Sequence, residues 1–100
     1  MTPLERLLTG PGPIRAALRA QFEVVSAVSR EWTGAGFFTG LHVPPAGAPP
    51  AAIEDGALGG PEFVLDADGL EQGAGFVVWI EGGRLQMLEG YSFDEPWPAP

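Results

Sequence analysis

The sequence predicts one α+β domain over residues 1–100, with N-terminal helices packed on an antiparallel sheet of four to five strands made largely of two hairpins. Three observations predict it: a helix-start signal at the N-terminus, a Gly-Gly pair between two apolar runs near the C-terminus, and a tetrapeptide that occurs twice. Gly-Ala-Gly-Phe stands at 34–37 and again at 73–76, each time at the start of an apolar run. One hundred residues with 45% hydrophobic content are enough for one modest core.

Two helices are expected first. Thr2-Pro3-Leu4-Glu5 has the spacing of a capping box with proline at the first helical position, and Gly10 closes this short helix. Pro13 can begin a second helix with apolar residues at helical spacing. We expect it to end near Glu23, because the β-branched valines that follow favour extended structure.

The first hairpin is expected from 24–32 and 36–43, with Gly34 and Ala35 as turn residues. This register places Trp32 opposite Phe37. The second Gly-Ala-Gly-Phe copy is expected to act in the same way, as a small-residue turn that leads into a strand.

A surface loop is expected over 44–61, because these eighteen residues include five prolines and four glycines. Phe63-Val64-Leu65 can form a short strand, which the turn at 66–69 ends.

The second hairpin is predicted from 76–81 and 84–91, which flank Gly82-Gly83. Counting outward from that turn places Met87 on the core face and groups Val77, Trp79 and Leu88 on the other face. That second apolar face must be covered by a helix, by the chain's tail or by another subunit.

The tail, 92–100, is extended by alternating prolines and rich in aromatic residues. Trp97 either folds back over the sheet as a lid, where a large aromatic gains by leaving water, or is offered to a partner.

The acidic residues are concentrated in the C-terminal half, where residues 51–100 hold ten carboxylates and one arginine. Such a field repels nucleic acid and anionic lipid and would attract a basic partner, although it also serves solubility alone. No apolar run reaches the roughly 18 residues of a membrane span, and no leader pattern is seen, so the expected location is cytoplasmic.

The residues that catalysis or metal binding would need are missing. There is no cysteine, and His42 is the only histidine, so we expect no metal site and no cofactor. Asp66-x-Asp68-Gly69 departs from a calcium loop because its glycine comes two residues early. No serine has the surroundings of a nucleophile, and we predict no catalytic residue.

Arg30, Glu31 and Trp32 are the densest cluster of functional side chains in the N-terminal half. An arginine and an indole on one strand face could bind a ligand by stacking and by a forked hydrogen bond. The structural alternative is a salt bridge at the strand edge over a packed indole.

Four blocks carry a resemblance. They are Arg30-Glu31-Trp32-Thr33-Gly34-Ala35-Gly36-Phe37-Phe38, Gly73-Ala74-Gly75-Phe76-Val77, Met87-Leu88-Glu89-Gly90-Tyr91 and Glu95-Pro96-Trp97-Pro98. Their succession resembles a group of small uncharacterised bacterial proteins. The resemblance implies a bacterial origin and a compact α+β domain, and it supplies no activity.

The sequence therefore favours a non-catalytic binding protein that forms a homodimer, with a basic protein as a candidate partner and an immunity- or antitoxin-like role as one form. The alternative is a small ligand-binding domain or enzyme that uses Arg30, Glu31 and Trp32 in a pocket. The candidate partner or ligand residues are Arg30, Glu31, Trp32, Trp79 and Trp97.

Overall fold

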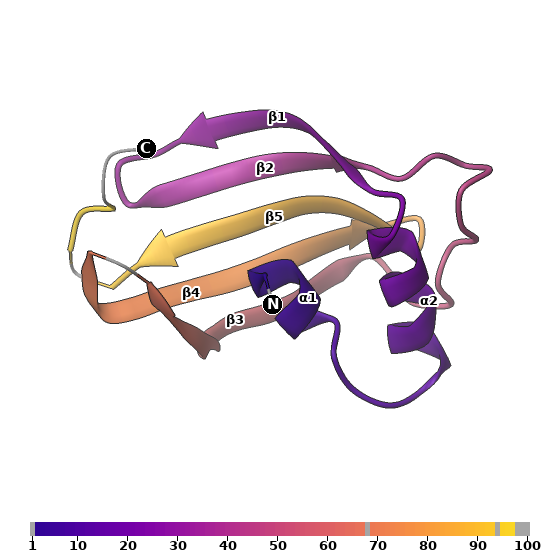
Figure 1. Ribbon diagram of the computed structural model, residues 1–100, viewed down its shortest axis with the longest axis horizontal. Helices are drawn as coiled ribbons and strands as arrows, with labels where there is room; N and C mark the ends of the chain where they lie inside the picture. Colours follow the sequence, from indigo (N-terminus) through magenta and orange to yellow (C-terminus); the bar gives the residue numbers. More distant parts are fainter. Residues whose placement is uncertain (1, 68, 94, 98–100) are drawn as a thin grey trace.

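The computed structural model describes residues 2–67, 69–93 and 95–97, so residues 94 and 98–100 of the expected tail lie outside the described residues. Two short helices precede one antiparallel sheet in the order β1-β2-β5-β4-β3 (Figure 1). The elements are α1 (Pro3–Leu7), α2 (Pro13–Phe22), β1 (Ser26–Trp32), β2 (Gly36–His42), β3 (Gly56–Ala67), β4 (Leu70–Glu81) and β5 (Arg84–Ser92). The fold is mostly sheet with N-terminal helices, and it belongs to the broad α+β class.

Both helices begin where the sequence predicts. The Thr2 hydroxyl accepts the Glu5 amide at 3.2 Å, and the Glu5 carboxylate accepts the Thr2 amide at 3.1 Å. The backbone hydrogen bond from Thr2 holds the pKa of Glu5 below its ordinary value. The second helix starts at Pro13, and Glu23 is its C-cap.

The first hairpin has the predicted register. Trp32 lies opposite Phe37, and Glu31 lies opposite Phe38. Gly34 has φ +84°, a conformation that glycine adopts without the strain a Cβ would bring, and this lets the chain reverse between β1 and β2.

The expected loop over 44–61 is wrong in its last part, because β3 begins at Gly56. Its glycines and Pro61 are tolerated since β3 is an edge strand, which needs ladder hydrogen bonds on one side only. The register of β3 against β4 shifts between Gly60 and Val64.

The second hairpin forms around Gly82-Gly83, with Glu81 opposite Arg84 and Ile80 opposite Leu85. The register then shifts, so Trp79 lies opposite Met87 instead of Gln86. Gln86 is the extra residue of a β-bulge. The predicted faces of the next two residues are therefore exchanged: Leu88 packs against the core, and Met87 joins Trp79 on the other face.

The second Gly-Ala-Gly-Phe copy does not open a strand, which corrects the expectation. It lies inside β4, which already begins at Leu70. Gly73 adopts φ +74° within the strand, and the register between β3 and β4 is irregular nearby, between Leu65 and Ala67. The glycine thus serves an in-strand irregularity rather than a turn.

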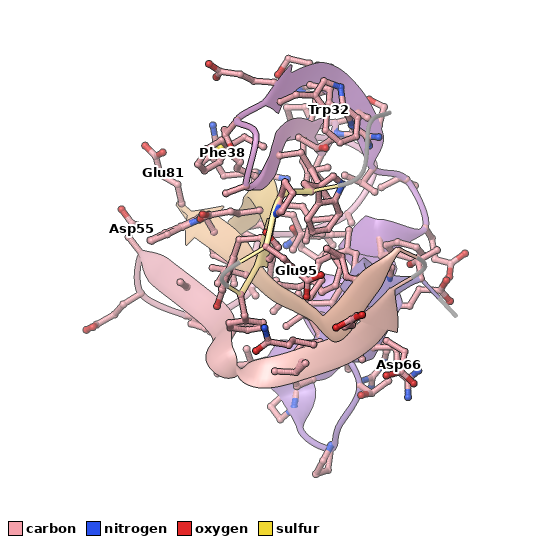
Figure 2. The ribbon with its side chains drawn as sticks, turned by 90° about the vertical axis from the view of Figure 1, so that its left-hand side faces the viewer. Trp32, Phe38, Asp55, Asp66, Glu81 and Glu95 are labelled. Carbon is pink, nitrogen blue, oxygen red and sulfur yellow. The ribbon has the colours of Figure 1, made fainter. Side chains whose placement is uncertain are left out.

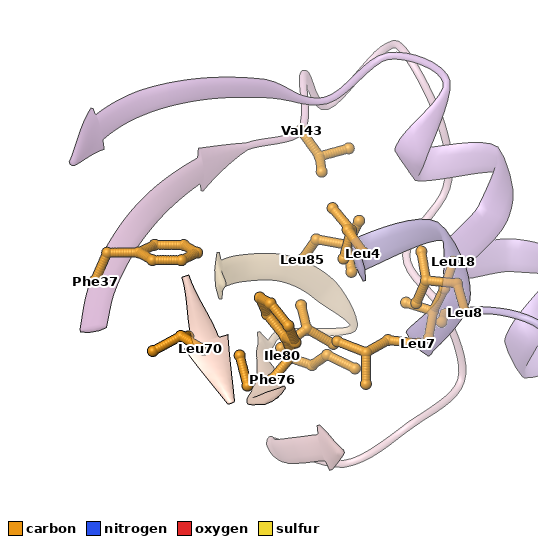
Figure 3. Packing of buried hydrophobic residues seen from close by; sticks show 13 residues of the cluster. Leu4, Leu7, Leu8, Leu18, Phe37, Val43, Leu70, Phe76, Ile80 and Leu85 are labelled. Carbon is orange, nitrogen blue, oxygen red and sulfur yellow. The ribbon is translucent and has the colours of Figure 1, made fainter. Parts of the chain in front are cut away.

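The core lies between the helices and one face of the sheet, here called the inner face (Figures 1 and 3). Leucines of both helices meet the inward-facing side chains of β4 and β5; this core includes Leu4, Leu7, Leu8, Leu18, Phe76, Val78, Ile80 and Leu85. The opposite surface, here called the outer face, bears no helix of the described chain. No helix in the described residues is long and apolar enough to cross a membrane.

Candidate interaction surface

The five candidate residues divide into two groups on opposite faces of the sheet. Strand alternation directs Arg30 and Trp32 to the inner face and Glu31 to the outer face, where Trp79 also lies. Trp97 joins the inner group. The three side chains Arg30, Glu31 and Trp32 therefore do not converge on one pocket, because a strand points neighbouring residues in opposite directions.

The inner group gathers around Phe37. Its ring centroid lies 5.7 Å from that of Trp32 and 5.3 Å from that of Trp97. The guanidinium carbon of Arg30 lies 5.3 Å from the Phe37 centroid and 5.8 Å from the Trp32 centroid. Arg30 Nε also donates to Thr39 Oγ1 at 3.0 Å, so the arginine is held over the rings by one hydrogen bond and by cation–π contact.

The described part of the tail is fastened to the end of the sheet. The Trp97 amide donates to the Gly34 carbonyl at 2.8 Å, and the Glu95 carboxylate accepts the Gln72 and Glu71 amides at 3.0 and 3.2 Å. Through these bonds the tail contacts both the β1–β2 turn and the start of β4. Trp97 thus folds back as a lid on the inner aromatic residues and leaves the outer face uncovered.

Apolar side chains lie together on the outer face, on the three middle strands of the sheet. We call them the outer patch: Phe38, Val77, Trp79, Met87 and Tyr91. Trp79 is 41% exposed and lies near the end of β4, two residues before Glu81. Its indole Nε1–H donates to Glu89 Oε1 at 3.3 Å, which orients the ring.

Carboxylates surround the outer patch. Glu31, Glu81 and Glu89 occupy outward-facing strand positions, and Asp55 lies beside the β4–β5 turn, where its Oδ1 accepts the Gly82 amide at 2.8 Å. Figure 2 shows Asp55, Glu81 and Phe38 on one side of the sheet, and Asp66 on the opposite side with the helices.

Four of the five arginines lie on the helix side of the sheet. Arg15 and Arg19 donate to backbone carbonyls at the end of α1 and in the segment that follows it, Arg6 is in α1, and Arg30 is on the inner face. Arg84 donates to the Ala48 carbonyl at 3.2 Å. The outer face therefore carries these carboxylates and, opposite Glu81, Arg84, whereas the other four arginines lie on the helix side together with Asp66 (Figure 2).

An open pocket of about 450 Å³ lies on the helix side. Its lining combines one cation, one carboxylate and two aromatic rings: Pro3, Arg6, Val64, Leu65, Asp66, Phe76 and Trp97. It is separate from Arg30 and Glu31, which the sequence proposed as pocket residues.

No group of three or more potential metal ligands occurs among the described residues. One titratable group on the outer face, the Tyr91 phenol, is partly removed from solvent. Burial raises the pKa of the Tyr91 phenol, and the nearby Glu89 charge raises it further. The hydroxyl itself is buried without a hydrogen-bond partner in the described structure.

Sequence reasoning missed Met87, Glu89 and Asp55 as parts of the outer surface. The bulge at Gln86 moved Met87 to that face, and a bulge leaves no clear local signal in this sequence. The same bulge moved Glu89, which is two residues from Met87 and shares its face, so counting from the turn would have placed it on the core face too. Asp55 reaches the site through a contact 27 residues away in sequence, which no local pattern indicates.

No family model, curated protein or solved structure matches this chain.

Proposed function

We propose that this chain is a non-catalytic binding protein that docks a basic protein partner on its outer face. One observation carries the proposal: an exposed, oriented indole stands in an apolar patch with carboxylates around it. Tryptophan is enriched among the residues that dominate binding energy, and a charged rim directs the encounter of opposite charges. An immunity- or antitoxin-like role, in which a basic protein is neutralised, is one form of this function.

The charge distribution favours a different partner over a second copy of this chain on that face. A twofold dimer brings the same patch of each subunit together, so Glu81 and Glu89 would meet carboxylates of the other copy. Like charges at an interface oppose association. Homodimerisation, expected from the sequence because of this apolar face, remains a prediction, which the sedimentation mass over a concentration series tests.

Affinity isolation with paired baits tests the proposed function. Wild type, Trp79→Ala and Trp32→Ala are immobilised and exposed to extract of the source cells. Trp32 is the matched control, since it is 42% exposed and lies on the inner face. We expect the wild-type and Trp32→Ala baits to retain a basic protein that the Trp79→Ala bait does not retain. When that protein is purified and titrated by calorimetry, it should bind wild type and Trp32→Ala more tightly than Trp79→Ala. Equal affinity for all three baits would refute the proposal.

A small-ligand site is the second candidate function, and the pocket beside Arg6 favours it. A cation next to Phe76 and Trp97 suits an aromatic carboxylate. Titration with benzoate and with neutral benzamide, followed by the indole signal of Trp97, tests this. Saturable binding of benzoate that Arg6→Gln abolishes would support it, and equal responses to both compounds would refute it.

A further inference from the structure

We infer that the hollow beside Trp79 receives an arginine side chain of the partner. This inference rests on the proposed function and specifies its chemistry. The hollow has a volume of about 440 Å³ and lies where β3, β4 and β5 meet the β4–β5 turn. It is lined by Asp55, Gly56, Trp79, Ile80, Glu81, Gln86 and Met87.

The sheet leaves one side of the indole open. On β5, Trp79 lies opposite Met87, whereas on β3 it lies opposite Ala57, whose methyl group covers little of a ring. The neighbours of Trp79 on the adjacent strands are therefore a thioether on one side and only a methyl group on the other.

The indole is fixed before any ligand arrives. The hydrogen bond from Nε1 to Glu89 restrains the ring at its nitrogen edge. A restrained aromatic ring loses little conformational entropy on binding, so more of the contact energy remains as affinity. The same bond places a carboxylate at the ring edge, which makes the surroundings of the ring more negative.

Charge and shape together select a guanidinium group. Asp55 and Glu81 line the hollow and Glu89 borders the indole, so a cation placed on the ring face has carboxylates near it. Arg84 pairs with Glu81 across the turn, but its guanidinium donates to the Ala48 carbonyl. A planar guanidinium can stack on an indole and direct its N–H groups at carboxylates at the same time. An ammonium group lacks the planar surface for stacking.

Binding of blocked amino acids tests the inference without knowledge of the partner. The chain has three tryptophans, so three indole N–H signals appear in a ¹H–¹⁵N correlation spectrum, and single Trp→Phe variants assign them. The probes are N-acetyl-arginine amide, N-acetyl-lysine amide and N-acetyl-citrulline amide. Citrulline has nearly the shape of arginine without its charge.

We expect the arginine probe to shift the Trp79 signal saturably, the lysine probe to bind more weakly and the citrulline probe to have no effect. Glu81→Gln should weaken the arginine probe about twofold to fivefold at low salt, as expected for one exposed ion pair. Trp32, equally exposed but next to Arg30, should not shift.

Three results would overturn the inference: no Trp79 shift with arginine, equal shifts with citrulline, or equal shifts at Trp32. The two experiments distinguish failure of the arginine site from failure of the proposed docking face. If Trp79→Ala loses the basic partner while the arginine probe leaves Trp79 unchanged, the docking face stands and the arginine site is refuted. If all baits retain the partner equally, the docking face itself is refuted.

Discussion

Phe37 and Phe76 end the two Gly-Ala-Gly-Phe copies, and both flank the same residue of β5. Each lies opposite Gly90, one from β2 and the other from β4, and their centroids are 6.4 Å apart. The glycines that precede them, Gly36 and Gly75, both lie opposite Tyr91. The two copies of the tetrapeptide therefore lie on the two strands that flank β5, and each copy places its phenylalanine beside Gly90.

Gly90→Ala should destabilise the fold. A Cβ at Gly90 would lie 2.5 Å from Phe37 Cε1 and 3.0 Å from Phe76 Cε1, and rings buried on the inner face have little room to move. Overpacking of this kind costs about 1–3 kcal/mol in the free energy of unfolding. Urea denaturation measures it.

Gly56→Ala is the matched control, because nothing lies within 4 Å of a Cβ at that strand position. It should change the stability by less than about 0.5 kcal/mol. Equal effects of the two substitutions would contradict the packing of both phenylalanines against Gly90.

Glu95→Ala should loosen the lid formed by Trp97. The carboxylate accepts two backbone amides at the start of β4, and its loss removes the bonds that hold the tail there. We expect a loss of about 1 kcal/mol and a red shift of Trp97 emission, measured in a background with Trp32→Phe and Trp79→Phe. Glu54→Ala, an exposed loop carboxylate, is the control. Unchanged emission would show that the lid does not depend on this carboxylate.

The parts of the fold that depend on short-range signals could be predicted. The capping box and the Gly82-Gly83 turn involve residues within a few positions of each other, and both form as expected. The sheet face that each β5 side chain occupies after Gln86 could not be predicted, because this bulge residue moves each later side chain of the strand to the opposite face. Sequence reasoning found Trp79 and missed the position of Met87 for this reason.

Gln21→Leu should cost more than its size suggests. Its side chain is fully buried, Nε2 donates to the Gly83 and Pro49 carbonyls, and Oε1 accepts the Leu85 amide at 2.9 Å. An amphipathic helix pattern gives no sign of this role, since a glutamine normally marks the solvated side. The substitution leaves the buried Leu85 amide without its partner and removes one of the two hydrogen bonds to the Gly83 carbonyl, so we expect a loss of about 1–3 kcal/mol in thermal or urea unfolding. Gln86→Leu, at an exposed position, should be close to neutral, and similar losses for both would refute the assignment.

Tyr91→Phe should be neutral or stabilising by about 1 kcal/mol, although it removes a polar group from a partly buried residue. The hydroxyl has no partner in the described structure, so its burial carries a desolvation cost that phenylalanine avoids. Gly75 accommodates the ring, since a Cβ there would lie 2.5 Å from Tyr91 Cζ, and this contact does not need the hydroxyl.

The same burial predicts a dependence on alkaline pH. Because burial raises the pKa of the Tyr91 phenol, the folded state favours the protonated form. The protonated phenol makes its full contribution to the free energy of unfolding below the phenol pKa of the unfolded chain, about 10. This contribution is lost as the pH rises through the higher phenol pKa of the folded chain. Tyr91 is the only tyrosine, so tyrosinate absorbance reports this group alone. We expect an elevated midpoint, which Glu89→Gln lowers in part, and a smaller alkaline loss of stability in Tyr91→Phe. A midpoint at the ordinary value, or a destabilised Tyr91→Phe, would mean that the hydroxyl reaches water or a hydrogen-bond partner.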